Sequence, residues 1–318
     1  MAKAYRKDPE TGKWLPYDPD EARKSALRDI AESREPSVRR RELERYAAVI
    51  DQLGDNAASS LWDVLMADLD MMRDVMTKDE WREFREALIE DLYQTRLYWS
   101  DAAGAEACDF YDSVITNRDE TGMFNPAQLP DQVSREQCAA TVRALAHYIF
   151  DGHMDKFVEK VVQNARDGVR GFANETIIRN ARRDGAKGVR YARVPVGVET
   201  CAFCIMLASR GFVYHSKESA EGNAHTHPDC DCKIVPGFEG DVVEGYDPEV
   251  YEAIYESNRG YDSRETINNI RREYLYPVHK EHINETKRQW WAANKDEQNA
   301  KRRAKAAERR KKEEAENG

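Results

Sequence analysis

Cysteine and histidine residues gather in one stretch of the chain, "ETCAFCIMLASRGFVYHSKESAEGNAHTHPDCDC" at positions 199–232. Four of the six cysteines and three of the seven histidines lie there, so the stretch stands out from an otherwise charged, hydrophilic sequence. Thiolates and imidazoles serve in proteins as metal ligands or as nucleophiles and bases. The order is Cys-x2-Cys, twenty-two residues, then His-x2-Cys. Two such pairs can close a tetrahedral zinc site.

The ligand set of this predicted zinc site leaves alternatives open. The pairs themselves are Cys201, Cys204, His227 and Cys230. Cys232 competes for the fourth position, because it would share a strand face with Cys230, and His225 is a weaker candidate. All four sulfurs could bind and leave the histidines out. A site with four protein ligands has no open position for substrate, which favours a structural zinc over a hydrolytic one.

Three catalytic templates match this stretch only in part. Zinc deaminases need H-x-E followed by P-C-x-x-C, whereas "HTH" has His227 at the glutamate position. The H-E-x-x-H helix of zinc proteases is absent from the sequence. "HTHP" resembles the H-x-H-P of JAMM-type metalloproteases, but Val235 and Phe238 stand where that motif requires Ser and Asp. A metal-dependent protease or toxin-like effector is therefore the alternative function, and a non-enzymatic protein is expected.

The neighbouring residues predict a small α+β module at 186–245 that positions the cysteines. "GVRYARVPVG" alternates Val189, Tyr191 and Val194 and predicts a strand. Thr200 is expected to cap a short helix over "CAFCIMLASRG", which Gly211 should stop. "FVYHS" is expected to form a second strand, "SKESAEGNA" a loop and "CKIV" an extended segment.

Elsewhere the apolar spacing predicts helices, so the fold class is mainly α with a small α+β Cys/His module in an elongated, multi-segment chain. The expected segments are an extended arm at 1–20, an acidic helical domain at 21–125, a helical segment at 126–185 and C-terminal helices with a basic tail at 246–318. Cys108 and Cys138 are expected to be small buried residues. The predicted core stripes contain Leu61, Val64, Leu65, Leu69, Met72, Val75, Trp81, Phe84, Leu88, Leu92, Tyr98, Val142, Leu145, Tyr148, Ile149, Phe157, Val161 and Val162.

Charge is unevenly distributed along a chain whose net charge is −10. Residues 51–120 carry a net −12 and residues 155–193 a net +5, which predicts an acidic half that faces a partner and basic segments that can meet phosphate. The start of the chain shows no secretory signal and no apolar run reaches membrane-spanning length, so synthesis in a reducing cytoplasm and no membrane partner are expected. The tail residues expected to bind nucleic acid are Lys301, Arg302, Arg303, Lys305, Arg309, Arg310, Lys311 and Lys312.

The segments "ARVPVGVETCAFCIMLASRGFVYHS" and "HTHPDCDCKIVPGF" resemble the C-terminal motif region of phage Mu F-like minor head proteins, especially those of actinobacterial phages. The resemblance covers about residues 188–238, and Asp231 replaces an arginine of many members. It implies a few-copy, portal-associated component inside the virion head that assists capsid assembly and genome packaging or delivery. Further partners would be the major capsid or scaffold protein and, without sequence preference, packaged DNA. The matching positions are Cys201, Cys204, His227, Pro228, Cys230 and Cys232.

Overall fold

The structure is a computed structural model that describes residues 4–7, 14–17, 36–71, 78–197, 200–214, 232–276 and 295. The chain divides into two compact units, one of residues 4–257 and one that contains the described residues from 258 onward. The fold class is confirmed as mainly α with a small α+β element. None of the described helices is long and apolar enough to cross a membrane.

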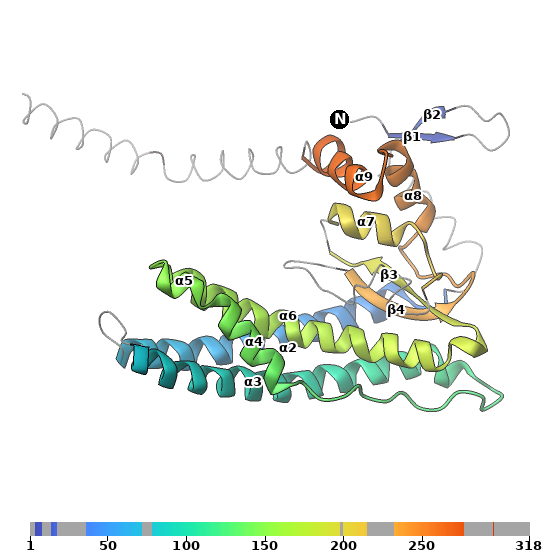
Figure 1. Ribbon diagram of the computed structural model, residues 1–318. Coiled ribbons are helices and arrows are strands. Elements are labelled where there is room, and N and C mark those ends of the chain that lie inside the picture. The colour runs from blue at the N-terminus through green and yellow to red at the C-terminus, as the bar shows by residue number, and fades with distance from the viewer. Residues whose placement is uncertain are drawn as a thin grey trace, which may run out of the picture. The chain divides into compact units, whose positions relative to one another are not determined.

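Three long helices form the body of the first unit: α2 (Arg40–Met71), α3 (Lys78–Val114) and α6 (Met154–Arg183). They run alongside one another, with the shorter α4 (Arg135–Leu145) and α5 (His147–Phe150) packed at one end (Figure 1). Ser134 begins α4 as an N-cap, because its hydroxyl accepts from the Gln137 N–H. The core shared by α2, α3, α4 and α6 includes Leu61, Leu65, Phe84, Leu88, Ile89, Leu92, Cys138, Val142, Phe157 and Val161.

The core stripes predicted from the sequence are confirmed at most of these positions and wrong at two. Val64 is 41% exposed, because the buried row of α2 steps from Leu61 to Leu65 and leaves the position between them outside. Tyr98 is 70% exposed. It stands six positions after Leu92. Because two helical turns take about seven residues, Tyr98 lies on a different face of α3 from Leu92. The side chains of Leu69, Met72 and Val75 lie outside the described residues.

Helices α2 and α6 approach closely and are joined by ion pairs. At Gly54 an added Cβ would stand 3.3 Å from both the side chain and the carbonyl of Arg166, a close contact that would require Arg166 to shift slightly. Three basic residues that the sequence predicted to be available for phosphate instead form ion pairs with carboxylates of the same unit. These pairs are Arg166 with Asp55 at 2.9 Å, Arg170 with Asp51 at 3.1 Å and Arg179 with Asp131 at 3.3 Å.

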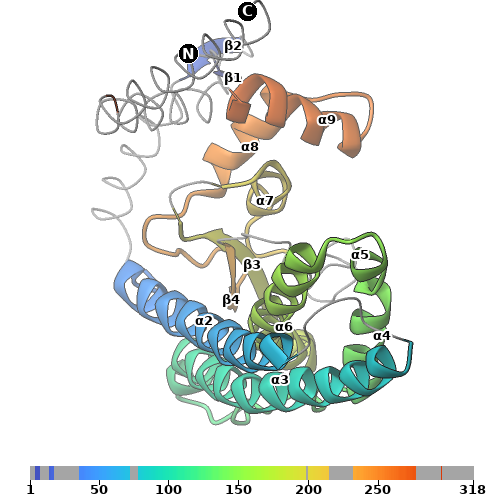
Figure 2. The ribbon, with the colours of Figure 1, turned by 90° about the vertical axis from the view of Figure 1, so that its left-hand side faces the viewer.

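The predicted α+β element is a two-stranded antiparallel sheet with a helix on top. We call this pair of strands the hairpin, although residues 196–231 lie between them in the sequence. Strands β3 (Val189–Pro195) and β4 (Cys232–Phe238) pair in the register Val189↔Phe238 to Pro195↔Cys232. Helix α7 (Ala202–Ala208) covers one face of the hairpin and the helical body covers the other (Figures 1 and 2). The hairpin is thus enclosed between two layers, which explains why nearly all its residues are buried.

The second strand expected at "FVYHS" is not formed within the residues described. Phe212 and Val213 make a turn after Gly211, whose φ is +64°, and only Tyr214 bridges β3. Tyr214 exchanges both backbone hydrogen bonds with Tyr191, at 2.8 and 3.3 Å. The glycine turn directly before the bridge prevents the pairing from extending to the residues that precede Tyr214. His215 and Ser216 lie outside the described residues.

The segment that leads into α2 meets the segment that follows β4. Val38 pairs in parallel with Val243, and Ser37 N–H donates to the Val242 carbonyl at 2.8 Å. Arg40 donates at 2.8 Å to the carbonyl of Val196, just past β3. The remaining elements are β1 (Ala4–Lys7), β2 (Trp14–Tyr17), η1 (Thr116–Arg118), η2 (Gly185–Lys187) and α8 (Pro248–Ser257), with α9 (Ser263–Asn269) and the π-helix η3 (Ile270–Leu275) in the second unit.

Candidate metal centre

Three of the five predicted metal ligands lie together in the structure. Cys201, Cys204 and Cys232 form a cluster of their own, in which Cys204 and Cys232 are buried and Cys201 is partly buried. The first two come from the start of α7 and the third from the start of β4. His227 and Cys230, like the weaker candidate His225, lie outside the described residues. We call the three described cysteines the sulfur cluster.

The beginning of α7 fixes the first two sulfurs. The helix starts one residue later than expected, so Cys201 rather than Thr200 is the N-cap. Its Sγ accepts from the backbone N–H of Cys204 at 3.3 Å, the role that a Ser or Thr oxygen usually plays. The expected capping by Thr200 is therefore wrong, because a cysteine at the following position can take the same acceptor role. Both sulfurs lie at one end of α7 as a result.

The hairpin register fixes the third sulfur. Cys232 opens β4 opposite Pro195, and alternation along the strand puts Cys232 and Ile234 on one face and Lys233 on the other. Lys233 Nζ reaches Asp51 on α2 at 2.9 Å, so its face is the one against the helical body. Cys232 consequently faces α7, where Cys201 and Cys204 stand.

The layer between α7 and the hairpin also contains buried polar side chains. Tyr214 donates its hydroxyl to the Leu207 carbonyl at 2.9 Å, and Tyr246 donates to the Ala208 carbonyl at 2.6 Å. These phenols satisfy carbonyls at the end of α7 that lack partners within the helix. Burial raises the pKa of Tyr214 to about 12, although the positive charges of Arg210 and Arg193 act in the opposite direction. Both tyrosines are thus held as neutral donors.

A buried guanidinium shares the face of the hairpin on which Cys232 lies. Arg193 pairs in register with Ile234, so both are on the α7 side, and the Arg193 side chain is completely buried. A buried cation is stable only among negative or strongly polar groups. Local sequence does not predict that this arginine is internal, because the burial of a charged strand residue depends on which distant elements pack against its face of the sheet.

The sulfur cluster does not complete a metal site by itself. Over the described parts of the chain, no three His, Cys, Asp or Glu side chains form a group that could hold a metal ion. What the geometry provides is sulfur donors that come from two segments and are enclosed by apolar layers. Such buried sulfurs can bind a soft metal together with a further ligand or pack as small apolar groups. Cys204 and Cys232 are buried, whereas Cys201 is partly exposed.

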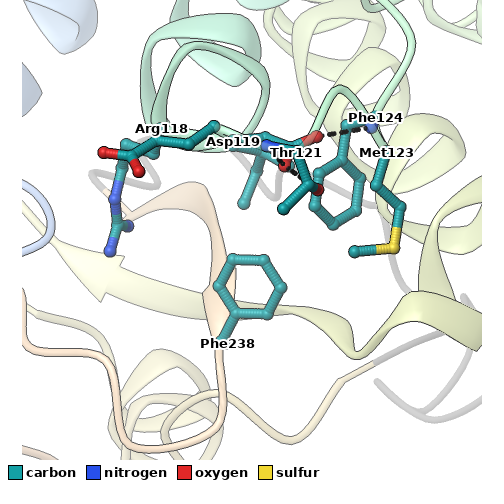
Figure 3. A pocket seen from close by; sticks show the side chains of 8 residues that line it. Arg118, Asp119, Thr121, Met123, Phe124 and Phe238 are labelled. Atoms are coloured by element: carbon teal, nitrogen blue, oxygen red, sulfur yellow. Dashed lines mark hydrogen bonds between the residues drawn. The ribbon is translucent and has the colours of Figure 1, made fainter.

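A hollow of about 360 Å³ lies where the loop after α3 meets the end of β4 (Figure 3). Its carboxylate Asp119 accepts from the backbone N–H groups of Thr121 and Phe124, at 2.9 and 2.8 Å. The hydrogen bond from the Thr121 hydroxyl, followed by these backbone bonds, lowers the pKa of Asp119 to about 2. Asp119 therefore shapes the loop and is not poised as an acid or base. The hollow is lined by Ile115, Arg118, Asp119, Glu120, Thr121, Met123, Phe124 and Phe238.

Comparison with known protein families places the chain in a phage family. The model of the VG15 protein family matches residues 37–258, more than two thirds of the chain, so the protein belongs to that family. VG15 proteins are phage-associated viral gene products, and the chain is accordingly a phage protein. No curated protein and no solved structure matches it.

The matched range coincides with structural boundaries. It begins at Ser37, where the chain first pairs with Val242, and it ends one residue beyond Ser257, the last residue of the first unit. The family region thus contains the helical body and the sulfur cluster together. The eight basic tail residues predicted to bind nucleic acid, Lys301 to Lys312, lie beyond that range and outside the described residues.

Proposed function

We propose that this phage protein is a minor head protein, a non-enzymatic component of the virion interior that assists capsid assembly and genome packaging or delivery. The observation that carries the proposal is the arrangement of β3, α7 and β4. The resemblance to Mu F-like proteins implies a Cys-x-x-Cys on a short helix and a closing apolar strand, and Cys201 to Ala208 and Cys232 to Phe238 have those conformations.

A binding role suits this architecture better than a catalytic one. Both strands of the hairpin are anchored to α2. Lys233 of β4 pairs with Asp51, and Arg40 donates to the carbonyl of Val196, the residue after β3. Cys204 and Cys232 are buried, so substrate could not reach their sulfurs without opening this layer. A rigid body of this kind can dock on another virion protein without rearranging, which lowers the entropic cost of assembly.

The partner that we propose is the portal protein, with the major capsid or scaffold protein as a further contact during assembly. The proposed location is the inside of the head, after assembly in the host cytoplasm. Packaged DNA is a second proposed contact, through the basic tail from Lys301 to Lys312. Such a contact would be independent of DNA sequence and would weaken steeply with salt, because it rests on phosphate charge.

A phage with an amber codon early in this gene tests the function. In a non-suppressing host we expect few DNA-filled heads in electron micrographs, and a plasmid copy of the wild-type gene should restore them. A copy with Cys108→Ser, a cysteine outside the sulfur cluster, should restore them equally. Normal numbers of filled heads and normal infectivity without the protein would overturn the proposal.

A further inference from the structure

We infer that the hollow between the loop after α3 and the end of β4 is a docking site for a segment of a partner protein (Figure 3). One large apolar side chain of that segment enters the hollow, and a lysine or arginine next to it in the segment meets the rim. Such a site goes beyond the proposed function, because it specifies the chemistry of one contact and holds whichever virion protein supplies the segment.

The walls of the hollow are mainly apolar and partly open to solvent. Phe124 of the loop faces Phe238 of β4, with ring centroids 6.0 Å apart, and the buried Ile115 also contributes to the lining. Met123 lies beside Phe124 and is 52% exposed, so apolar surface continues from the hollow onto the outside of the loop (Figure 3). A volume of about 360 Å³ can accept a bulky side chain, and its entry would remove this apolar surface from water.

The loop that carries Met123 and Phe124 is held in place by the rest of the unit. Lys187 donates to the Met123 carbonyl at 2.8 Å, and Arg183 donates to the Asn125 carbonyl at 2.8 Å. The carbonyls on both sides of Phe124 are thus anchored to η2 and to the end of α6. Because the loop is already ordered, a partner that docks there loses little binding free energy to the ordering of this site.

The charges around the hollow determine what kind of segment fits. Glu120 lines the hollow, the exposed Glu239 directly follows Phe238, and neither forms an ion pair within the described parts of the chain. Arg118, the basic residue of the lining, is paired with Asp241 at 3.4 Å. The rim therefore has two uncompensated carboxylates, which attract a basic side chain and repel the phosphates of nucleic acid.

The hollow itself favours an apolar side chain over a cationic one. Lys187 Nζ lies over the Phe124 ring, 5.0 Å from its centroid, so a positive charge already interacts with that ring. A second cation against the same ring would be repelled by this ammonium group. An aromatic or aliphatic side chain in the hollow, with its basic neighbour near Glu120 or Glu239, satisfies both conditions.

Binding of synthetic peptides to the full-length protein tests the docking site. The probe is a short fluorescein-labelled peptide with one tryptophan between two arginines, flanked by glycine and serine. We expect saturable binding with a micromolar dissociation constant by fluorescence polarisation. A peptide with serine in place of the tryptophan, and one with glutamates in place of the arginines, should each bind about tenfold more weakly or worse.

Variants of the protein assign this binding to the hollow. Glu120→Lys and Glu239→Lys should each weaken binding of the tryptophan–arginine peptide by about fivefold, since each reverses one charge of the rim. Met123→Asp puts a charge on the apolar surface beside Phe124 and should weaken binding by about tenfold. The matched control is Glu83→Lys, which makes the same change in net charge at an exposed position near the start of α3 and should bind as the wild type does. Because all four substituted positions are exposed, the variants should fold, and circular dichroism checks that they do.

Three outcomes would overturn the inference: no saturable binding of the tryptophan–arginine peptide, equal binding of the glutamate peptide, or an equal loss of binding in Glu83→Lys and Glu120→Lys. The last outcome would show an effect of net charge alone. Because these measurements use isolated protein, their failure would leave the proposed role in head assembly untouched. Normal heads without the protein would likewise leave the docking site standing.

Discussion

Lys233 Nζ lies 2.9 Å from Asp51 Oδ1, and this ion pair joins the hairpin strand β4 to helix α2. The Lys233 side chain is 5% exposed, whereas that of Asp51 is 40% exposed and also forms an ion pair with Arg170 at 3.1 Å. The residue directly before Lys233 is Cys232 of the sulfur cluster. The strand that carries the third sulfur is therefore anchored to the helical body within one residue of that sulfur.

Removing the carboxylate of this pair should cost more than removing the ammonium group. Asp51→Asn leaves a buried lysine without its counter-charge, and we expect a loss of about 1–3 kcal/mol in the free energy of unfolding. Lys233→Met keeps the aliphatic stem and leaves only a half-exposed carboxylate, so its loss should be smaller. Urea denaturation measures both. Asp79→Asn, in an exposed pair with Arg82, is the control and should change stability by less than about 0.5 kcal/mol. A larger loss for Lys233→Met than for Asp51→Asn would contradict this account of the pair.

Asp184 should make the protein sensitive to acid. It is completely buried, and burial alone would raise the pKa of its carboxyl. Hydrogen bonds from Arg183, Lys187 and Tyr111 outweigh burial, and the pKa is lowered below its ordinary value of 3.8. The stability that this carboxylate contributes is thus fully present above about pH 4 and is lost as the pH falls below that value.

Replacing Asp184 by Asn separates this contribution from those of other carboxyls. At pH 7 we expect a loss of about 2–3 kcal/mol in unfolding free energy, because charge-assisted hydrogen bonds to a buried group disappear. The difference from wild type should shrink as the pH is lowered from 5 to below 4. Tyr111→Phe, which removes one donor at 2.9 Å, should cost about 1 kcal/mol and retain the acid dependence. If the difference in unfolding free energy between Asp184→Asn and the wild type stays constant across this pH range, the Asp184 carboxylate is not the cause of the acid sensitivity.

Gly211 should be required for the chain to leave α7 in the observed direction. Its φ of +64° is a conformation that residues with a Cβ seldom adopt. Gly211→Ala should lower the unfolding free energy by about 1 kcal/mol. Gly185→Ala is the matched control, because its φ is not positive and an added Cβ would meet nothing within 4 Å. Equal effects of the two substitutions on thermal unfolding would rule out the conformational explanation.

Cys201 caps α7, and the sequence also predicts it as a zinc ligand; the two roles can be separated by experiment. Serine is at least as good an N-cap as cysteine, so Cys201→Ser should match the wild type in stability when a chelator is present. With zinc added, only the wild type should gain thermal stability, since metal binding to the folded state stabilises it. Cys201→Ala should be less stable than both in the chelator, by about 1 kcal/mol. If zinc stabilises Cys201→Ser as much as it does the wild type, Cys201 is a cap and not a ligand.

Much of the fold followed from periodicity and turn residues in the sequence. The stripes through Leu61, Leu88 and Phe157 identified core helices, and the alternation of Val189, Tyr191 and Val194 identified β3. Such patterns work because they depend on local spacing alone. The spacing of Cys201 and Cys204 likewise indicated a helix start, with an error of one residue in the capping position.

Features that depend on contacts between distant segments were not predictable. Nothing local distinguishes Arg193, which is completely buried, from Arg182 on the exposed surface of α6. The pairing of Arg166 and Arg170 with acidic residues of α2 likewise depends on how the helices pack. The basic run alone therefore predicts side chains available for phosphate, whereas the structure pairs them with carboxylates. Cys232 joins the other two sulfurs only because the register Pro195↔Cys232 puts it under α7.

The proposed role in the head is tested most directly by the protein composition of purified virions. Particles are dissociated into heads and tails on a density gradient, and peptides of this protein are quantified in each fraction by mass spectrometry against the major capsid protein. The account predicts a few copies per particle, all in the head fraction. Absence from the particles, or recovery with the tails alone, would contradict it.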